Sequence, residues 1–180
     1  MRTEPFPAES FPAVPFRTAR LDLVPLRVGH AEEMAAVLSD PALHVFIGGA
    51  PLGGEELRAR YERLVAGSGD PGVSWCNWVL RLRGDGRAGG PLVGTVQATV
   101  HGGEVAEIAW VVGSAWQGRG FASEAARGLV GVLRRGGIGT FVAHIHPAHH
   151  ASAAVATAAG LLPTGEAEDG ETVWRSAPAE

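Results

Sequence analysis

Hydrophobic and polar positions follow two different periods along the chain. In its first part, Arg20–Leu26 has the two-residue period of a strand, whereas His30–Leu38 and Glu55–Val65 have the apolar spacing of amphipathic helices. Segments rich in valine and tryptophan then predict an antiparallel meander. Its strands are expected at Ser74–Arg83, Leu92–Val100 and Val105–Val112, with turns at Gly84–Gly90 and His101–Gly103.

Helices and strands alternate in the C-terminal half. A helix is predicted over Phe121–Arg135, where the apolar residues form one stripe and Glu124 lies in the first turn. A strand over Thr140–His146 and a short helix over Ser152–Ala159 follow, and Asp169-Gly170 is a hairpin-turn signal. The predicted order, βααβββαβα with a terminal hairpin, favours a three-layer α/β domain with a mixed sheet.

The first fifteen residues differ from the rest. Four of them are proline, which blocks regular structure, so residues 1–15 are predicted to form an extended or mobile arm. Residues 16–180 are predicted to be a single domain, since no repeat or change of composition divides them. No segment has the continuous apolar stretch of a signal peptide or a membrane helix, and a soluble, cytoplasmic protein is therefore expected.

Charge and residue counts exclude several classes of protein. Fifteen cations, all of them Arg, and nineteen acidic residues give a net charge of −4, which argues against a nucleic-acid binder. The absence of Lys excludes a Walker A loop, a pyridoxal Schiff base and a lysine nucleophile. The single Cys76 excludes an internal disulfide framework and a cysteine-based zinc finger, and its apolar strand predicts a small core residue.

The most informative segment runs from Glu107 to Glu124. A strand is predicted to end near Val112 and a helix to begin near Phe121, and the loop between them contains Gly118 and Gly120. Such a loop presents unpaired backbone amides at the positive end of a helix dipole, which favours an anion such as a diphosphate. A tight strand-to-helix connection without a ligand is the alternative. No third glycine stands at the offset that a dinucleotide fingerprint requires.

The spacing Gln117-x-x-Gly120-x-Ala122 resembles the acetyl-CoA pyrophosphate loop of the GNAT-type N-acetyltransferases. Other segments resemble the RimJ/RimL-like branch, which acetylates ribosomal-protein N-termini, and they occur in the family's order. They are Thr18–Leu23, Ala106–Trp110, Ser123–Ala125, Pro147–Ser152 and Ala159–Leu161. The resemblance implies a GNAT-like α/β fold with a mixed, mostly antiparallel central sheet flanked by helices.

The resemblance also implies acetyl-CoA as cosubstrate. The residues that would bind it are Val111, Val112, Gln117, Gly118, Arg119, Gly120, Phe121, Ala122, Ser123 and His149. The family commonly has Asn at the position of His149, where it would cap the next helix and contact the pantetheine arm. A neutral imidazole makes only one such hydrogen bond at a time. A backbone amide of Val111 or Val112 could polarise the acyl oxygen.

Two residues are candidates for catalysis. Glu107 shares a strand face with Ala109 and Val111, and burial among such neighbours would make its carboxylate a suitable base for an ammonium group. An exposed glutamate or a structural ion-pair partner is the alternative. Ser152 matches the serine near the thioester sulfur and could protonate the leaving thiolate; an ordinary helix cap is the alternative.

These observations predict an acetyl-CoA-dependent N-acetyltransferase that acts on a primary amine of a small molecule or a protein N-terminus, as a monomer or homodimer. A non-catalytic CoA-binding module and an acyltransferase for larger acyl groups remain alternatives. The run His144–His150 could bind zinc, but no Cys or carboxylate completes the set nearby, so no metal is predicted. The acceptor site is expected between the two N-terminal helices, the loop Phe46–Pro51 and the terminal hairpin.

Overall fold

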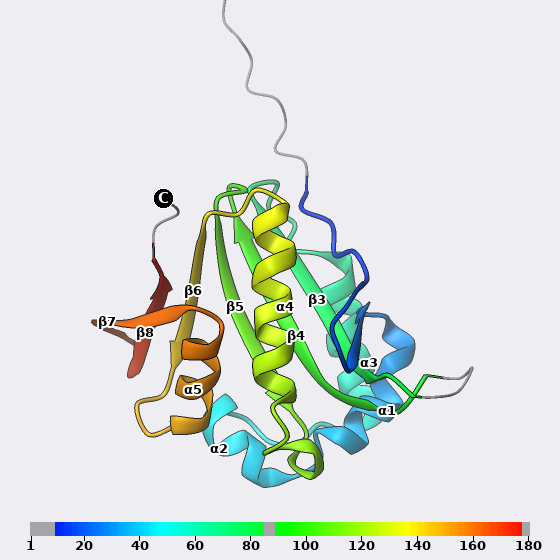
Figure 1. Ribbon diagram of the computed structural model, residues 1–180. Helices are drawn as coiled ribbons and strands as arrows, with labels where there is room; N and C mark the ends of the chain where they lie inside the picture. The colour runs from blue at the N-terminus through cyan, green and yellow to red at the C-terminus, as the bar shows by residue number, and fades with distance from the viewer. Residues whose placement is uncertain (1–9, 85–88, 178–180) are drawn as a thin grey trace, which may run out of the picture.

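A mixed sheet forms the centre of the computed structural model, which describes residues 10–84 and 89–177 (Figure 1). In these residues the sheet has eight strands in the order β1-β2-β3-β4-β5-β6-β8-β7. They are β1 (Phe16–Arg17), β2 (Leu21–Pro25), β3 (Val73–Leu82), β4 (Leu92–His101), β5 (Val105–Val112), β6 (Thr140–Ile145), β7 (Leu161–Glu168) and β8 (Glu171–Ser176). The α-helices are α1 (Ala31–Val37), α2 (His44–Ile47), α3 (Gly54–Ala66), α4 (Phe121–Arg135) and α5 (His150–Ala158).

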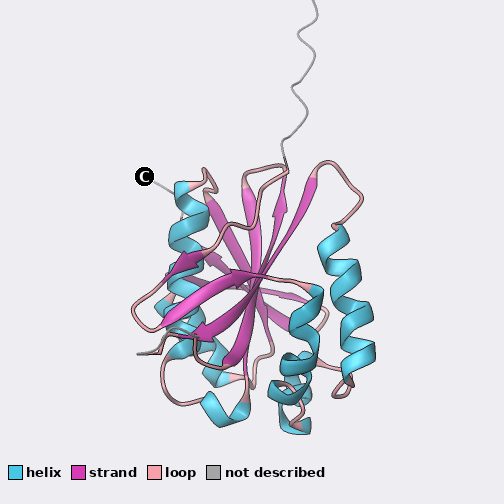
Figure 2. Ribbon diagram, turned by 90° about the vertical axis from the view of Figure 1, so that its right-hand side faces the viewer, coloured by secondary structure: helices cyan, strands magenta, loops and turns pink. Residues whose placement is uncertain are grey.

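Helices cover both faces of the sheet, so the predicted three-layer α/β architecture is confirmed (Figure 2). On one face, α4 buries the apolar stripe that includes Ala125, Leu129 and Leu133 in the main core. On the other face, α1 and α3 contribute to a smaller core of their own. The predicted limits of α4 and β5 agree with the structure, because a glycine-bounded stripe and a strict two-residue period are local signals.

The only parallel pair among the described strands is β5 with β6, and it is short. Its register joins Val105–Glu107 with Thr140–Val142 and then stops. All other neighbouring strands are antiparallel. The C-terminal ends of β5 and β6, from Ile108 and Ala143 onward, are therefore not paired with each other, although β5 remains paired with β4 as far as Val112. This separation opens the sheet at one end.

Three details differ from the predicted elements. The helix expected at Ser152 begins two residues earlier, at His150, so Ser152 lies inside its first turn. The segment expected to be a loop from Phe46 onward starts instead in the helix α2. A one-turn 3-10 helix, Pro41–Leu43, precedes it, because the Asp40 carboxylate accepts a hydrogen bond from the Ala42 amide and Pro41 suits a first helical position.

The described part of the N-terminal arm is extended and packs along the sheet; residues 1–9 lie outside the described residues. The Phe11 amide donates to Ser74 Oγ at 2.9 Å, and Trp78 Nε1 donates to the Val14 carbonyl at 2.8 Å. Cys76 is fully buried beside this segment, and burial raises the pKa of its thiol to about 11. The thiol is thus a core group, as predicted, and is not ionised at neutral pH.

The terminal hairpin forms as its sequence predicts. Asp169 and Gly170 both have positive φ, at 49° and 84°, which is the backbone of a type I′ turn between β7 and β8. The turn predicted at Gly84–Gly90 falls partly on residues 85–88, outside the described residues. Within the described part of the chain, no helix is long and apolar enough to cross a membrane.

Candidate active site

The loop between β5 and α4 turns back on the end of its strand. The Gln117 side-chain amide donates to the Val112 carbonyl at 3.0 Å. Gly118 and Gly120 have φ of 73° and 79°, a region that L side chains rarely adopt, and open space lies where a Cβ of Gly118 would stand. Gly120 is the N-cap residue of α4 and has no side chain to satisfy the first amides of the helix. These amides are available to a ligand.

Two residues of the turn between β1 and β2, Thr18 and Arg20, hold this loop through Glu124 of α4, and the three are here called the clasp. Glu124 Oε1 accepts from the Thr18 hydroxyl at 2.6 Å and from the Arg20 amide at 2.7 Å, and Oε2 accepts from Arg20 Nε at 2.6 Å. Arg20 also donates to the Arg119 carbonyl at 2.9 Å, within the loop itself. Partial burial would raise the pKa of Glu124, but the hydrogen bonds from Thr18 and Arg20 outweigh it and keep that pKa below its ordinary value. The loop is thus fixed by residues about a hundred positions away.

Beside the loop lies a cavity of about 390 Å³, here called the loop cavity. Its wall brings together nine of the ten residues predicted to bind the cosubstrate, and Ser152 as well. The nine are Val111, Val112, Gln117, Gly118, Gly120, Phe121, Ala122, Ser123 and His149. The tenth, Arg119, does not line the cavity, and its guanidinium lies over the Trp116 ring.

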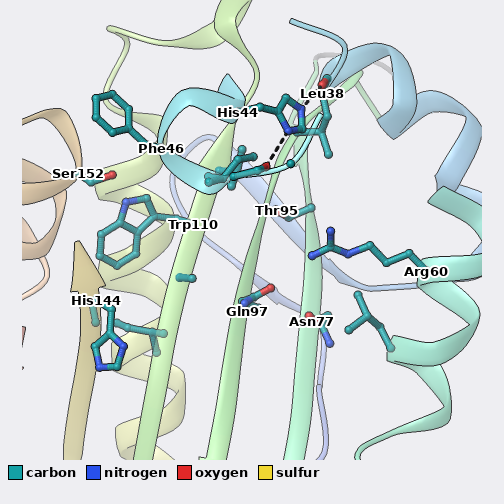
Figure 3. Close-up of a pocket in the computed structure, with 18 of the residues that line it drawn as sticks. Leu38, His44, Phe46, Arg60, Asn77, Thr95, Gln97, Trp110, His144 and Ser152 are labelled. Atoms are coloured by element: carbon teal, nitrogen blue, oxygen red, sulfur yellow. Dashed lines mark hydrogen bonds between the residues drawn. The ribbon is translucent and has the colours of Figure 1, made fainter. Parts of the chain in front are cut away.

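A second cavity of about 450 Å³, here called the sheet cavity, lies against strands β3 to β6, under α2 and α3 (Figure 3). The two cavities adjoin, because both are lined by Trp110 and Val111 of β5, by Ser152 of α5 and by a few neighbouring residues. Trp110 and Val111 belong to the part of β5 that has separated from β6. The opening in the sheet is therefore the passage between the two cavities.

Glu107 does not lie where the buried-base hypothesis requires. Its strand face is as predicted, but its side chain is 50% exposed and lines neither cavity, because it belongs to the stretch of β5 that still pairs with β6. Its carboxylate lies 3.9 Å from His144 Nδ1, and the other ring nitrogen of His144 lies 3.7 Å from Glu168. His144 does line the sheet cavity. The imidazole, and not the carboxylate, reaches the cavity.

His149 occupies the N-cap position of α5, but the capping role predicted for its side chain is wrong. The ring makes no capping hydrogen bond and stacks on Phe46, with ring centroids 4.1 Å apart and planes 6° from parallel. Burial, with a smaller contribution from His146, lowers the pKa of His149 below 6.5. The stacked rings form a wall common to both cavities.

Among the described residues, no three His, Cys, Asp or Glu side chains gather closely enough to hold a metal ion.

Sequence reasoning missed the polar lining of the sheet cavity. Arg60 and Tyr61 come from α3, and Asn77, Thr95 and Gln97 come from β3 and β4. Arg60 does carry a local signal, because it lies between Leu57 and Leu64 on the helix face that otherwise packs inward. The strand residues carry none, since nothing local indicates which polar strand face a helix will cover.

The hydroxyl of Tyr61 is buried and has no hydrogen-bond partner among the described residues. The residue is 4% exposed, and burial raises the pKa of the hydroxyl to about 12. The neighbouring helix α2 is attached through His44, whose two ring nitrogens lie 3.2 Å from the carbonyl oxygens of Leu38 and Gly48. The His44 ring thus has a partner at each nitrogen, whereas the Tyr61 hydroxyl is an unpaired polar atom buried behind the cavity wall.

Solved structures share this architecture. An acetyltransferase from Agrobacterium tumefaciens is 25% identical, with a TM-score of 0.69, and the match covers 98% of this chain and 99% of that one. The microcin C7 self-immunity acetyltransferase MccE, in complex with acetyl-CoA and AMP, is 16% identical (TM-score 0.71; 88% and 93% covered). RimL, a ribosomal L7/L12 α-N-protein acetyltransferase in complex with coenzyme A, is 19% identical (TM-score 0.67; 88% and 93% covered). They confirm the GNAT-like fold.

A comparison with curated protein sequences gave no match. The family model described as "Acetyltransferase (GNAT) domain" matches residues 20–162. This range contains the loop, the clasp residues Arg20 and Glu124, and the strands that separate at the passage. The chain belongs to the GNAT acetyltransferase family.

Proposed function

We propose that this protein is an N-acetyltransferase that transfers the acetyl group of acetyl-CoA to a primary amine. One observation carries the proposal: two cavities adjoin through the opening between β5 and β6, and each has the lining that one of the two substrates needs. The loop cavity offers amides for an anion, and the sheet cavity offers a separate space on the other side of Trp110. An acyl group and an amine would meet in the passage.

The loop cavity fits the pyrophosphate and pantetheine of acetyl-CoA. A diphosphate at the start of α4 would accept from the free amides of Phe121, Ala122 and Ser123 and would be favoured by the helix dipole. The stacked rings of Phe46 and His149 offer an apolar wall for the pantetheine arm. The GNAT structures of RimL with coenzyme A and MccE with acetyl-CoA support this assignment. Arg119 is exposed at the rim, where it could add a diffuse positive charge.

The residues of the passage suggest how the transfer would proceed. His144 would accept a proton from the acceptor ammonium, with Glu107 and Glu168 stabilising the resulting imidazolium from either side. The amine nitrogen would then form a bond to the thioester carbon while the carbon–sulfur bond breaks. The Ser152 hydroxyl would give its proton to the departing thiolate, and its oxygen would take the second proton of the amine nitrogen, which leaves a neutral amide and a neutral serine. A backbone amide of Val111 or Val112 would polarise the acyl oxygen. In this mechanism Glu107 acts through His144 and is a positioning residue. Ser152 is the proton donor to the thiolate, which is the role that the family resemblance implies.

The test is an acceptor screen that measures release of the CoA thiol from acetyl-CoA and from longer acyl-CoA thioesters. Turnover of at least one primary amine with acetyl-CoA is expected. Ser152→Ala should lower kcat and leave CoA affinity unchanged, whereas the control Thr157→Ala, on the exposed side of the same helix, should change neither. Intact CoA binding without turnover of any amine would support a CoA-binding module instead. Faster turnover of a longer thioester would favour a larger acyl group.

A further inference from the structure

The sheet cavity has a polar end opposite the passage. Figure 3 shows Arg60 reaching from α3 toward Thr95, with Asn77 and Gln97 next to it on the strands, while Trp110 and Ser152 lie across the cavity. Asn77 and Gln97 are direct partners in the β3–β4 register, so their side chains stand side by side on one face. The side chains of the four polar residues at this end, Arg60, Asn77, Thr95 and Gln97, make no hydrogen bond or ion pair within the described residues.

Tyr61 belongs to the same wall, but its hydroxyl oxygen is buried behind the cavity surface and is not presented to a ligand. The side chains of Arg60, Asn77, Thr95 and Gln97 can all donate hydrogen bonds. Together they form a set of donors, one of them cationic, that has no acceptor among the described residues.

Negative charge is scarce in this cavity. Among its described lining residues, Glu171 of β8 is the only carboxylate and Arg60 is the only arginine. A polyamine or an aminoglycoside carries several ammonium groups and would need several carboxylates around it. An acceptor with one amine and one anionic group meets the charge distribution better. The volume of about 450 Å³ lies in the range of pockets for small molecules.

We infer that the acceptor is a small amino carboxylic acid, whose amine lies at the passage near Trp110 and whose carboxylate is bound by Arg60 with the surrounding neutral donors. This inference rests on the proposed function and names its substrate class. A guanidinium binds a carboxylate through two parallel hydrogen bonds, which would fix the orientation of the amine toward the thioester. The apolar residues Ile47, Leu57 and Leu64 of the same wall would contact the carbon skeleton between the two charged ends.

The experiment measures kcat/KM for α- and ω-amino acids, each paired with its carboxamide, which keeps the shape and removes the charge. An acid should be preferred over its amide by about 10- to 100-fold, the usual worth of a charge-assisted contact. Arg60→Gln should abolish that preference, and Asn77→Ala should reduce it. The control Arg58→Gln, an exposed arginine of the same helix outside the cavity, should leave it intact. Amides accepted as well as acids, or equal effects of the two arginine variants, would overturn the inference.

A second measurement separates this inference from the proposed function. Binding of an N-acetyl amino acid and of its amide, in the presence of CoA, requires no turnover. Tighter binding of the acid, lost in Arg60→Gln, supports the carboxylate site even if no amine releases CoA, in which case only the proposed function fails. Equal binding of acid and amide contradicts the carboxylate site even if other amines are acetylated. Preference for an aminophosphonic acid over the matching amino acid would overturn the carboxylate assignment and indicate an acceptor with a phosphate-like group.

Discussion

The two cavities are built from the chain in opposite ways. The loop cavity takes most of its wall from one short stretch, residues 110–123, and from the beginning of α5. The sheet cavity takes its wall from α2, α3 and five strands of the sheet, brought together from residues 26 to 171. The loop cavity can therefore be recognised in the sequence as a motif with fixed spacing, whereas the sheet cavity exists only after the strands have paired. The loop cavity can be kept as one local pattern, while each residue of the sheet cavity can change separately.

The largest effect is expected on the acceptor side, at His144. His144→Gln should reduce kcat about 100-fold or more, the usual contribution of a general base. Glu107→Gln should cost about 10-fold, since a positioning charge contributes less. Steady-state rates at saturating acetyl-CoA measure both, with the exposed His101→Gln as control. A larger loss in Glu107→Gln than in His144→Gln would return the role of base to the carboxylate.

On the loop side, Gly120→Val should weaken CoA binding about 10- to 100-fold, because a β-branched residue is strained at φ 79° and the loop must move to relieve it. Gly137→Val is the matched control, since Gly137 also has positive φ, at the other end of α4, and lines neither cavity. Both variants should lose similar stability, but only Gly120→Val should lose affinity in a calorimetric titration. Equal CoA affinities in the two variants would place the anion elsewhere.

The clasp that holds the loop gives a third test. Glu124→Gln should lower the free energy of unfolding by about 1–3 kcal/mol, since the carboxylate accepts three short hydrogen bonds. Because the pKa of Glu124 lies below the ordinary 4.5, the difference from the parent should be complete above pH 4.5 and vanish as the pH falls through the folded-state value. Urea denaturation over a pH series measures it. Glu62→Gln, exposed on α3, should show no such difference.

The smallest effect is expected at His149, in the wall that the two cavities share. Burial disfavours the charged form of the ring and lowers its pKa below 6.5, and a pantetheine arm against the ring would bury it further. CoA affinity should therefore stay constant near neutral pH and weaken as the pH falls below 6.5. His149→Asn should remove this dependence. His149→Ala should weaken binding at every pH by a factor of up to about 10, the worth of one neutral contact. A pH dependence that persists in His149→Asn would belong to another group.

Local sequence signals correctly predicted the elements whose ends are marked by residues within the element itself. They failed where a residue far away in the sequence determines the local structure. The Asp169-Gly170 turn and the stripe of α4 are of the first kind. The burial expected for Glu107 depended on how far β6 remains paired with β5, which no property of β5 alone reveals. His149 was expected to cap a helix because it stands where the family commonly has a capping Asn, but its ring stacks on Phe46, a hundred residues away, and makes no capping hydrogen bond.

The stacked pair Phe46 and His149 has a kinetic and thermodynamic consequence. Both residues line both cavities, so a molecule in either cavity contacts the same two rings. Any shift of the pair by one substrate changes the affinity for the other, and linkage requires the factor to be identical in both directions. The Kd of an acceptor analogue should therefore change when CoA is bound, and the Kd of CoA should change by the same factor when the analogue is present. A single aromatic contact would in this way couple the binding of two unlike molecules.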